Sequence, residues 1–160
     1  MKRIPTFLLR AAVLAIGATV LALCIFALPT MWMAIPEEYP NHTYVFYCIL
    51  IALYVAAIPF FVALHQAMRL LRYIDTGKAF SVLSVVALRR IAYCAIAISA
   101  VFVASMPFFF IWAQHDDAPG LIVIGMILVG ASFVIAVFAG VLERLFRDAI
   151  EIKSENDLTV

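Results

Sequence analysis

Residues 121–142 read LIVIGMILVGASFVIAVFAGVL, and this stretch decides the fold class. It contains no charged side chain, and it lacks the alternation of apolar and polar positions that strands of a membrane barrel show. A bilayer core about 30 Å thick is crossed by roughly 20 helical residues. Because lipid cannot satisfy unpaired backbone groups, a stretch of this kind predicts a membrane-spanning helix.

Three further stretches have the same character. Asp, Glu, Lys and Arg are absent from 11–36, 39–68 and 91–115, as they are from 118–142. We therefore expect four transmembrane helices, over about 11–33, 44–64, 91–112 and 121–142. The composition agrees, since 67% of the 160 residues are hydrophobic and 13% are charged. Soluble domains carry about 25% charged residues. The sequence predicts an all-α, integral membrane four-helix bundle that forms a single membrane domain over 1–160.

The net charge of +1 conceals a separation of charge between the two sides of the membrane. All 11 lysines and arginines precede the first span, lie between the second and third, or follow the fourth. The other two loops hold only acids, at Glu37, Glu38, Asp116 and Asp117. Basic residues are enriched on the cytosolic side of membrane proteins. Both termini, the loop 65–90 and the tail 143–160 are therefore expected in the cytosol.

Helices are expected to continue beyond the membrane on the cytosolic side. The second helix contains no breaker before about Tyr73, and Asp75-Thr76-Gly77 is a turn signal. Ser81 suits the N-cap of the third helix. The fourth helix is expected to continue as Glu143–Ile152, where Glu143 precedes Arg147 in the favourable i,i+4 order. One apolar stripe on this continuation comprises Leu142, Leu145, Ala149 and Ile152.

The spans offer little on which to build chemistry. They contain no carboxylate, histidine or base, the groups that proton-coupled transport and catalysis usually require. We expect no catalytic residue, no cofactor and no enzymatic activity. Weak candidates for a metal site lie in the outer loops, because imidazole and carboxylate suit zinc, but they lack ligand spacing. These are His42, His115, Asp116 and Asp117. A solvated polar rim is the preferred interpretation.

Two patterns have alternative explanations. Cys24 and Cys48 lie at similar depth, which fits either a disulfide or, preferably, two small core residues. Small residues recur at every fourth position, which favours packing inside the bundle or, less strongly, a homodimer seam. The repeats are Ser132-Ala136-Gly140, Ala11-Ala15-Thr19 and Ala100–Ala104.

Three short motifs carry a family resemblance. They are Gly77-Lys78-Ala79-Phe80-Ser81, Leu88-Arg89-Arg90-Ile91 and Glu155-Asn156-Asp157-Leu158-Thr159-Val160. Together they resemble the YoaS-like family of bacterial four-helix inner-membrane proteins, a domain of unknown function. That family often has Glu-Asn after its Phe-Ser element, where this chain has Leu83-Ser84. The resemblance implies the bacterial cytoplasmic (inner) membrane and supplies no catalytic residues.

The resemblance also implies a partner, because family members are often encoded beside a small Cro/C1-type helix-turn-helix regulator. Our leading hypothesis is a non-enzymatic membrane protein that tethers or regulates such a protein through its cytosolic face. Besides this regulator, the expected partners are the lipid bilayer and a second copy in a homodimer, with no direct binding of nucleic acid. The alternatives are a small transporter or pore, suggested by Pro59 and Pro107, and a structural bundle or dimer. The expected partner-binding residues are Arg89, Arg90, Phe146, Arg147, Ile150, Glu155, Asp157 and Leu158.

Overall fold

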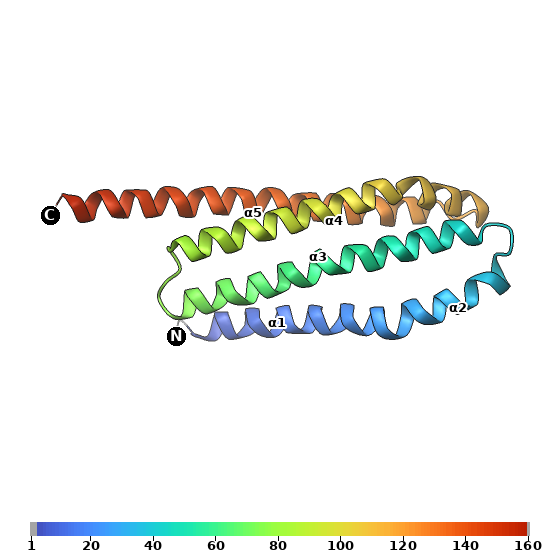
Figure 1. The fold of residues 1–160 in the computed structure, drawn as a ribbon, viewed down its shortest axis with the longest axis horizontal. Coiled ribbons are helices and arrows are strands. Elements are labelled where there is room, and N and C mark those ends of the chain that lie inside the picture. Colours follow the sequence, from blue (N-terminus) through green and yellow to red (C-terminus); the bar gives the residue numbers. More distant parts are fainter. Residues whose placement is uncertain (1–2, 160) are drawn as a thin grey trace.

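The computed structural model describes residues 3–159, and nearly all of them are helical (Figure 1). The elements are α1 (Arg3–Ala22), the π-helical turn η1 (Leu23–Ala27), α2 (Leu28–Glu38), α3 (Thr43–Asp75), α4 (Val82–His115) and α5 (Gly120–Leu158). α1, η1 and α2 follow one another without a break, so the chain forms four long rods. Each rod is long and apolar enough to cross a membrane. This confirms the all-α four-helix prediction.

The rods lie side by side in a row (Figure 1). α5 packs extensively on α4 and α4 on α3, whereas the first rod packs more lightly on α3. Within residues 3–159, no comparable interface joins α1 to α5. The outer rods therefore bury few residues, and their exposed apolar side chains, such as Phe7 and Phe138, suit contact with lipid.

The two ends of the row differ in charge. The first rod begins, α3 ends, α4 begins and α5 ends at the same end of the molecule (Figure 1). We call this the basic end, because it holds Arg10, Arg69, Arg72, Lys78, Arg89, Arg90, Arg144, Arg147 and Lys153. The opposite, acidic end holds Glu37, Glu38, Asp116 and Asp117. Lys2, which was counted among the bases, lies outside the described residues.

The densest packing lies toward the acidic end. A cluster of buried side chains joins α2, α3 and the last third of α4, with Trp112 and Tyr54 packed against it. Its members are Leu28, Ile35, Val45, Phe46, Ile49, Leu50 and Phe109. On the neighbouring α4–α5 interface, Gly125 lies so close to Met106 that an added Cβ would meet the sulfur at 2.9 Å. These contacts fix the acidic end, so the α2–α3 and α4–α5 connections there are held in place.

A π-helical turn separates α1 from α2, and Pro29 lies two positions after its last residue, Ala27. In this turn the backbone N–H of Leu28 donates to the carbonyl of Leu23, five residues back. With the same five-residue spacing, the carbonyl of Cys24 would accept a hydrogen bond from the backbone N–H of residue 29. That residue is Pro29, which has no backbone N–H. The Tyr54 hydroxyl on α3 donates to the Cys24 carbonyl instead, at 3.0 Å. The bond satisfies a carbonyl in a setting where lipid offers no donor, and it fastens the first rod to α3.

The basic end contains the turn and cap that the sequence predicts. α3 ends at Asp75, and Gly77 has a φ of +73°, a conformation that glycine adopts without strain. The Ser81 side chain accepts a hydrogen bond from the backbone N–H of Ser84, which confirms it as the N-cap of α4. Most of the expected loop 65–90 is therefore helical.

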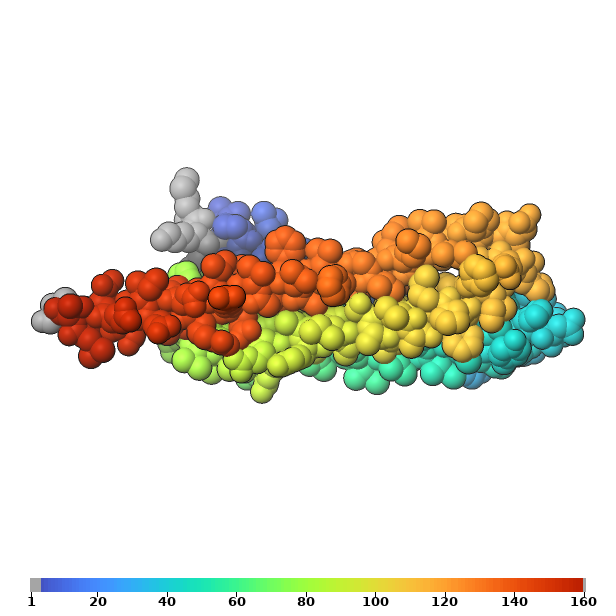
Figure 2. Space-filling model, turned by 90° about the horizontal axis from the view of Figure 1, so that it is seen from above, coloured from blue at the N-terminus to red at the C-terminus, as the bar shows by residue number. Residues whose placement is uncertain are grey.

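Helix α5 is longer than expected. The predicted continuation ends at Ile152, but the helix runs to Leu158, because no glycine or proline interrupts it after Gly140. A helix of 39 residues rises about 58 Å, nearly twice the thickness of a bilayer core. The C-terminal part of α5 accordingly projects beyond the other helices (Figures 1 and 2). We call residues 143–158 the α5 extension.

Of the three small-residue repeats, one takes the packing role preferred from the sequence and two do not. On α5, Ala136 is buried and its stripe partners Ser132 and Gly140 are half-buried, so this repeat belongs to the interface with α4. Ala100 and Ala104 on α4 remain exposed, as does the Ala11-Ala15-Thr19 stripe on α1. The three cysteines are free and half-buried: Cys24, Cys48 and Cys94.

Candidate functional site

A polar cluster at the acidic end centres on Asp116, in the connection between α4 and α5. Its Oδ2 accepts hydrogen bonds from the Tyr39 hydroxyl at 3.0 Å and from Trp112 Nε1 at 2.8 Å. Its Oδ1 lies 3.1 Å from Nδ1 of His115. Tyr39 also stacks on Phe46, with ring centroids 4.2 Å apart. The cluster therefore links the α2–α3 connection to the α4–α5 connection.

These hydrogen bonds shift two pKa values in opposite directions. The bond with His115 has the largest effect and lowers the pKa of Asp116; burial opposes it, but the bonds from Trp112 and Tyr39 add to it, so the pKa lies below its usual value. The hydrogen bond that the Tyr39 hydroxyl donates to Asp116 raises the pKa of Tyr39. Burial and the nearby negative charge raise it further. The cluster thus favours a charged Asp116 and a neutral Tyr39, the donor–acceptor pair that holds the two connections together.

The metal candidates meet only in part. The rings of His42 and His115 approach with centroids 4.8 Å apart, and His115 contacts Asp116. Asp117 follows Asp116 in the same connection and has a positive φ of 52°. Within residues 3–159, no three His, Cys, Asp or Glu side chains form a group that could hold a metal ion. Since Tyr39 and Trp112 occupy one oxygen of Asp116, the arrangement serves as a structural link.

The hydroxyl groups inside the helices are engaged with the backbone. Ser99 on α4 donates to the carbonyl of Val129 on α5 at 3.4 Å. Ser105 donates to Phe102 at 2.9 Å and Ser132 to Leu128 at 2.7 Å. These bonds explain the serines as packing groups, which is how serines in membrane helices are often used.

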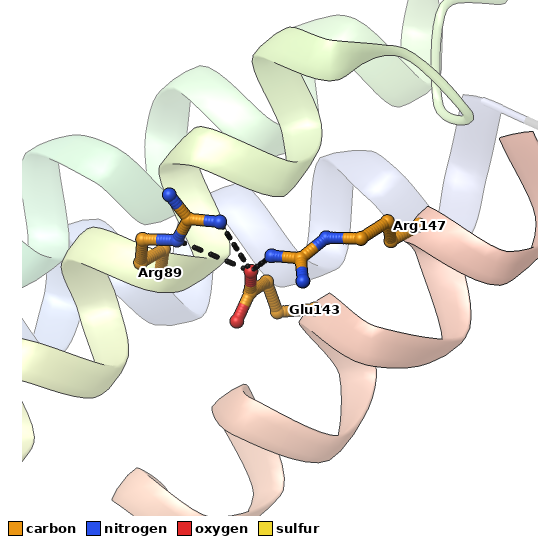
Figure 3. A network of polar contacts seen from close by, with 3 residues as sticks. All are labelled: Arg89, Glu143 and Arg147. Carbon is orange, nitrogen blue, oxygen red and sulfur yellow. Dashed lines mark hydrogen bonds and ion pairs between the residues drawn. The ribbon is translucent and has the colours of Figure 1, made fainter.

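The polar network at the basic end joins α4 to the start of the α5 extension. Both Nε and Nη2 of Arg89 donate to Oε1 of Glu143, at 3.2 and 3.0 Å. Arg147, one turn further along α5, pairs with the same oxygen (Figure 3). The Glu143 side chain is mostly buried, whereas both arginines are about half exposed. A second ion pair, between Arg10 and Asp75 at 2.5 Å, joins α1 to α3 at this end.

The expected partner-binding residues fall into two groups. Arg89, Phe146 and Arg147 are already engaged, the arginines with Glu143 and Phe146 with the ring of Phe80 at 5.1 Å between centroids. Ile150 is half-buried beside them. The remaining residues are exposed, namely Arg90 on α4 and Glu155, Asp157 and Leu158 on the α5 extension. Val160, which ends the quoted motif, lies outside the described residues.

Two of these contacts had incomplete signals in the sequence. The i,i+4 spacing predicts the pair of Glu143 with Arg147, but nothing local predicts that Arg89 joins it from another helix. The contact of Phe80 with Phe146 likewise joins the α3–α4 connection to α5 and has no periodic signature. Only the structure shows that one carboxylate holds the base of the α5 extension on α4, and that one aromatic pair holds it on the α3–α4 connection.

The fold and the charge distribution define a four-helix membrane protein with separate acidic and basic ends. The chain belongs to the family described as "Protein of unknown function (DUF2975)", whose model matches residues 30–160. This segment begins in α2 and includes the closely packed helices α3, α4 and α5. The chain is 54% identical over 160 residues, 100% of both chains, to the "Uncharacterized membrane protein YoaS" of Bacillus subtilis (strain 168). No solved structure matches. The resemblance inferred from the sequence is confirmed.

Proposed function

We propose that this protein is a non-enzymatic docking protein of the bacterial cytoplasmic membrane, and that its α5 extension binds a cytosolic protein. The observation that carries the proposal is the projection of a clamped, charged helix beyond the rest of the fold (Figure 2). Ion pairs hold the base of this helix on α4, while Glu155, Asp157 and Leu158 stay exposed near its end. A helix held at its base presents these side chains with little loss of conformational entropy on binding.

The charge distribution supports a cytosolic basic end. The loops at the acidic end contain no lysine or arginine, whereas basic residues flank every helix terminus at the other end. This is the asymmetry that sets the orientation of multi-pass proteins. In the proposed orientation both termini and the α5 extension lie in the cytosol. A reporter enzyme that is active only in the cytosol should be active when fused after residue 160, and inactive when inserted after Asp117.

The family resemblance suggests the partner to test first, a small Cro/C1-type helix-turn-helix regulator encoded beside the gene. The net charge of the α5 extension is negative, since Glu143, Asp148, Glu151, Glu155 and Asp157 outnumber its bases. A basic surface on the partner would complement it. In this proposal the membrane protein controls the regulator by holding it at the membrane, and itself binds no nucleic acid.

Co-purification from mild detergent tests this proposal. Full-length protein should retain the regulator, and a variant that lacks residues 154–160 should lose most of it. A Glu37→Gln variant is a matched control, because it alters one acid at the opposite end. The proposal fails if the regulator never co-purifies and if removal of 154–160 leaves the transcripts that it controls unchanged.

A small transporter or pore has weaker support. Two grooves on the helix faces are lined by apolar side chains, one by Ile96, Ala100 and Phe133 and the other by Cys48, Ala52 and Phe108. Both grooves are open rather than enclosed. Polar solutes need polar or charged groups along their route. Substrate-dependent flux in proteoliposomes would favour transport over docking.

A purely structural role predicts that deletion of the gene changes neither transport nor transcription.

A further inference from the structure

Part of the α5 extension exposes apolar side chains outside the charge-free stretch of the helix. Leu145 and Ile152 are 56% and 60% exposed, and Leu142 at the boundary is 41% exposed. They are separate from the side of α5 that packs on α4, where Glu143, Phe146 and Ile150 are half-buried or clamped. At 3.6 residues per turn, the two sides lie roughly a third of a turn apart. The exposed residues therefore form a free face.

The spacing of this face is that of a coiled coil. Leu142, Leu145, Ala149, Ile152 and Asn156 follow one another at intervals of three, four, three and four residues; Ala149 is half-buried and the other four are exposed. This is the alternation of a and d positions in a heptad, with Leu142, Ala149 and Asn156 at a. A polar asparagine at a single a position is a device by which coiled coils fix register and a two-stranded state.

The flanking charges complement the same arrangement. In this register Asp148 occupies a g position and Lys153 occupies the e position of the following heptad. In a parallel pair, a g residue faces the e residue five positions later on the other helix. Asp148 of one chain would therefore face Lys153 of a second copy, and the pair would form twice by symmetry. Within one helix these residues are five apart, which is not an i,i+3 or i,i+4 pair.

The membrane supplies the parallel orientation. Copies inserted with the same topology have parallel α5 helices, and confinement to a bilayer raises their effective concentration. The face also continues into the span, where Phe138 and Ile135 are exposed at the next positions of the same alternation. The exposed face therefore extends over both the span and the α5 extension.

We propose that the α5 extension pairs with its counterpart in a second copy of this chain as a short parallel coiled coil. The core is formed by Leu142, Leu145, Ala149, Ile152 and Asn156, and Asp148–Lys153 pairs flank it. This interface goes beyond the proposed docking function, because it requires no other protein. It leaves Ile150, Asp157 and Leu158 on other sides of the helix.

Disulfide cross-linking in isolated membranes tests the interface. The three native cysteines are replaced by alanine in the full-length chain, which is produced in a host without the regulator. Ile152→Cys places a thiol at a d position, and Ser154→Cys places one at the outer f position only two residues away. With a membrane-permeant oxidant, Ile152→Cys should form covalent dimer at least about fivefold faster, since a disulfide requires close Cβ atoms. Equal rates at the two positions would overturn the proposal.

Charge exchange provides the second measurement. In the Ile152→Cys background, Asp148→Lys alone and Lys153→Asp alone place like charges opposite each other, and each should slow cross-linking. The double variant Asp148→Lys with Lys153→Asp restores opposite charges and should restore the rate. If the double variant is as slow as the slower single variant, the parallel pairing is wrong. Because no regulator is present, this outcome is independent of whether the docking function holds.

Discussion

The ion pair between Arg89 and Glu143 is one of the contacts that hold the α5 extension in place, and its strength can be measured by a double-mutant cycle. The perturbations are Arg89→Gln, Glu143→Gln and the two combined. Glutamine keeps most of each side chain's length but removes its charge. The cycle isolates the coupling between the two residues from their other contacts, including the one between Glu143 and Arg147.

The structure sets the expected magnitude. Two donors of Arg89 reach one oxygen of Glu143 at 3.2 and 3.0 Å, and hydrogen bonds to charged groups contribute about 1.5–3 kcal/mol when they are well shielded. The Arg89 side chain is 47% exposed, however, and exposed ion pairs contribute only about 0.2–1 kcal/mol. Because the Glu143 side chain is mostly buried, we expect this pair to contribute near the upper limit of the range for exposed ion pairs. We expect a coupling of about 1 kcal/mol, roughly fivefold in the unfolding equilibrium.

The assay is reversible unfolding in mild detergent, followed by tryptophan fluorescence. Trp32 and Trp112 lie toward the acidic end, so their signal reports loss of the whole fold rather than local change beside Glu143. Glu151→Gln on the exposed side of α5 is the control and should change stability little. The coupling should decrease in high salt, because both arginines are open to solvent. A coupling within about 0.3 kcal/mol of zero at low salt would refute the clamp.

Three further predictions concern other parts of the fold. Gly125→Ala should be less stable than Gly130→Ala by about 1 kcal/mol in the same unfolding assay, because its new methyl group would meet the Met106 sulfur at 2.9 Å and force that side chain to move, whereas open space surrounds Gly130. Both variants gain the same helix propensity, so Gly130→Ala should be neutral or stabilising. Tyr54→Phe should cost about 0.6–1.7 kcal/mol, and the cost should shrink in a Pro29→Ala background, where a backbone N–H is restored to the π-helical turn. Because the folded pKa of Asp116 lies below its usual value, its contribution to stability is present above the unfolded pKa near 4 and is lost as pH falls through the folded value. Asp116→Asn should therefore reduce this part of the acid dependence, and an unchanged pH profile would contradict the assignment.

The sequence predicts what depends on local chemistry. The four spans follow from missing charges, the end of α3 from Asp75-Thr76-Gly77, and the start of α4 from the Ser81 cap. The end of α5 is harder to predict. Ser154 and Asn156 are weak helix formers, but no breaker accompanies them, so the helix continues to Leu158.

The order of the helices could not be predicted, because hydropathy reports contact with lipid or protein without distinguishing them. A helix that is apolar on all sides gives no periodic signal for the face that packs on a neighbour. The Asp116 cluster joins the α2–α3 connection to the α4–α5 connection, and the bond from Tyr54 to Cys24 joins α3 to the π-helical turn. Such contacts depend on which helices are neighbours. They cannot be predicted from the sequence, because hydropathy does not identify the neighbours.

The open row also explains why α5 is the helix suited to both proposed interactions. It is the longest helix and lies at the edge of the row. Its only extensive interface within residues 3–159 is with α4. In the proposed orientation lipid covers its outer face within the bilayer, whereas Leu145 and Ile152 on the same face lie beyond the bilayer in water, where apolar exposure is unfavourable. Pairing with a second copy removes that exposure and places two α5 extensions side by side. A regulator with two-fold symmetry would then meet two docking sides at once, and binding at the first would raise the effective concentration for the second. Variants that abolish cross-linking at Ile152 should therefore also weaken retention of a dimeric partner, even though they leave Ile150, Asp157 and Leu158 intact.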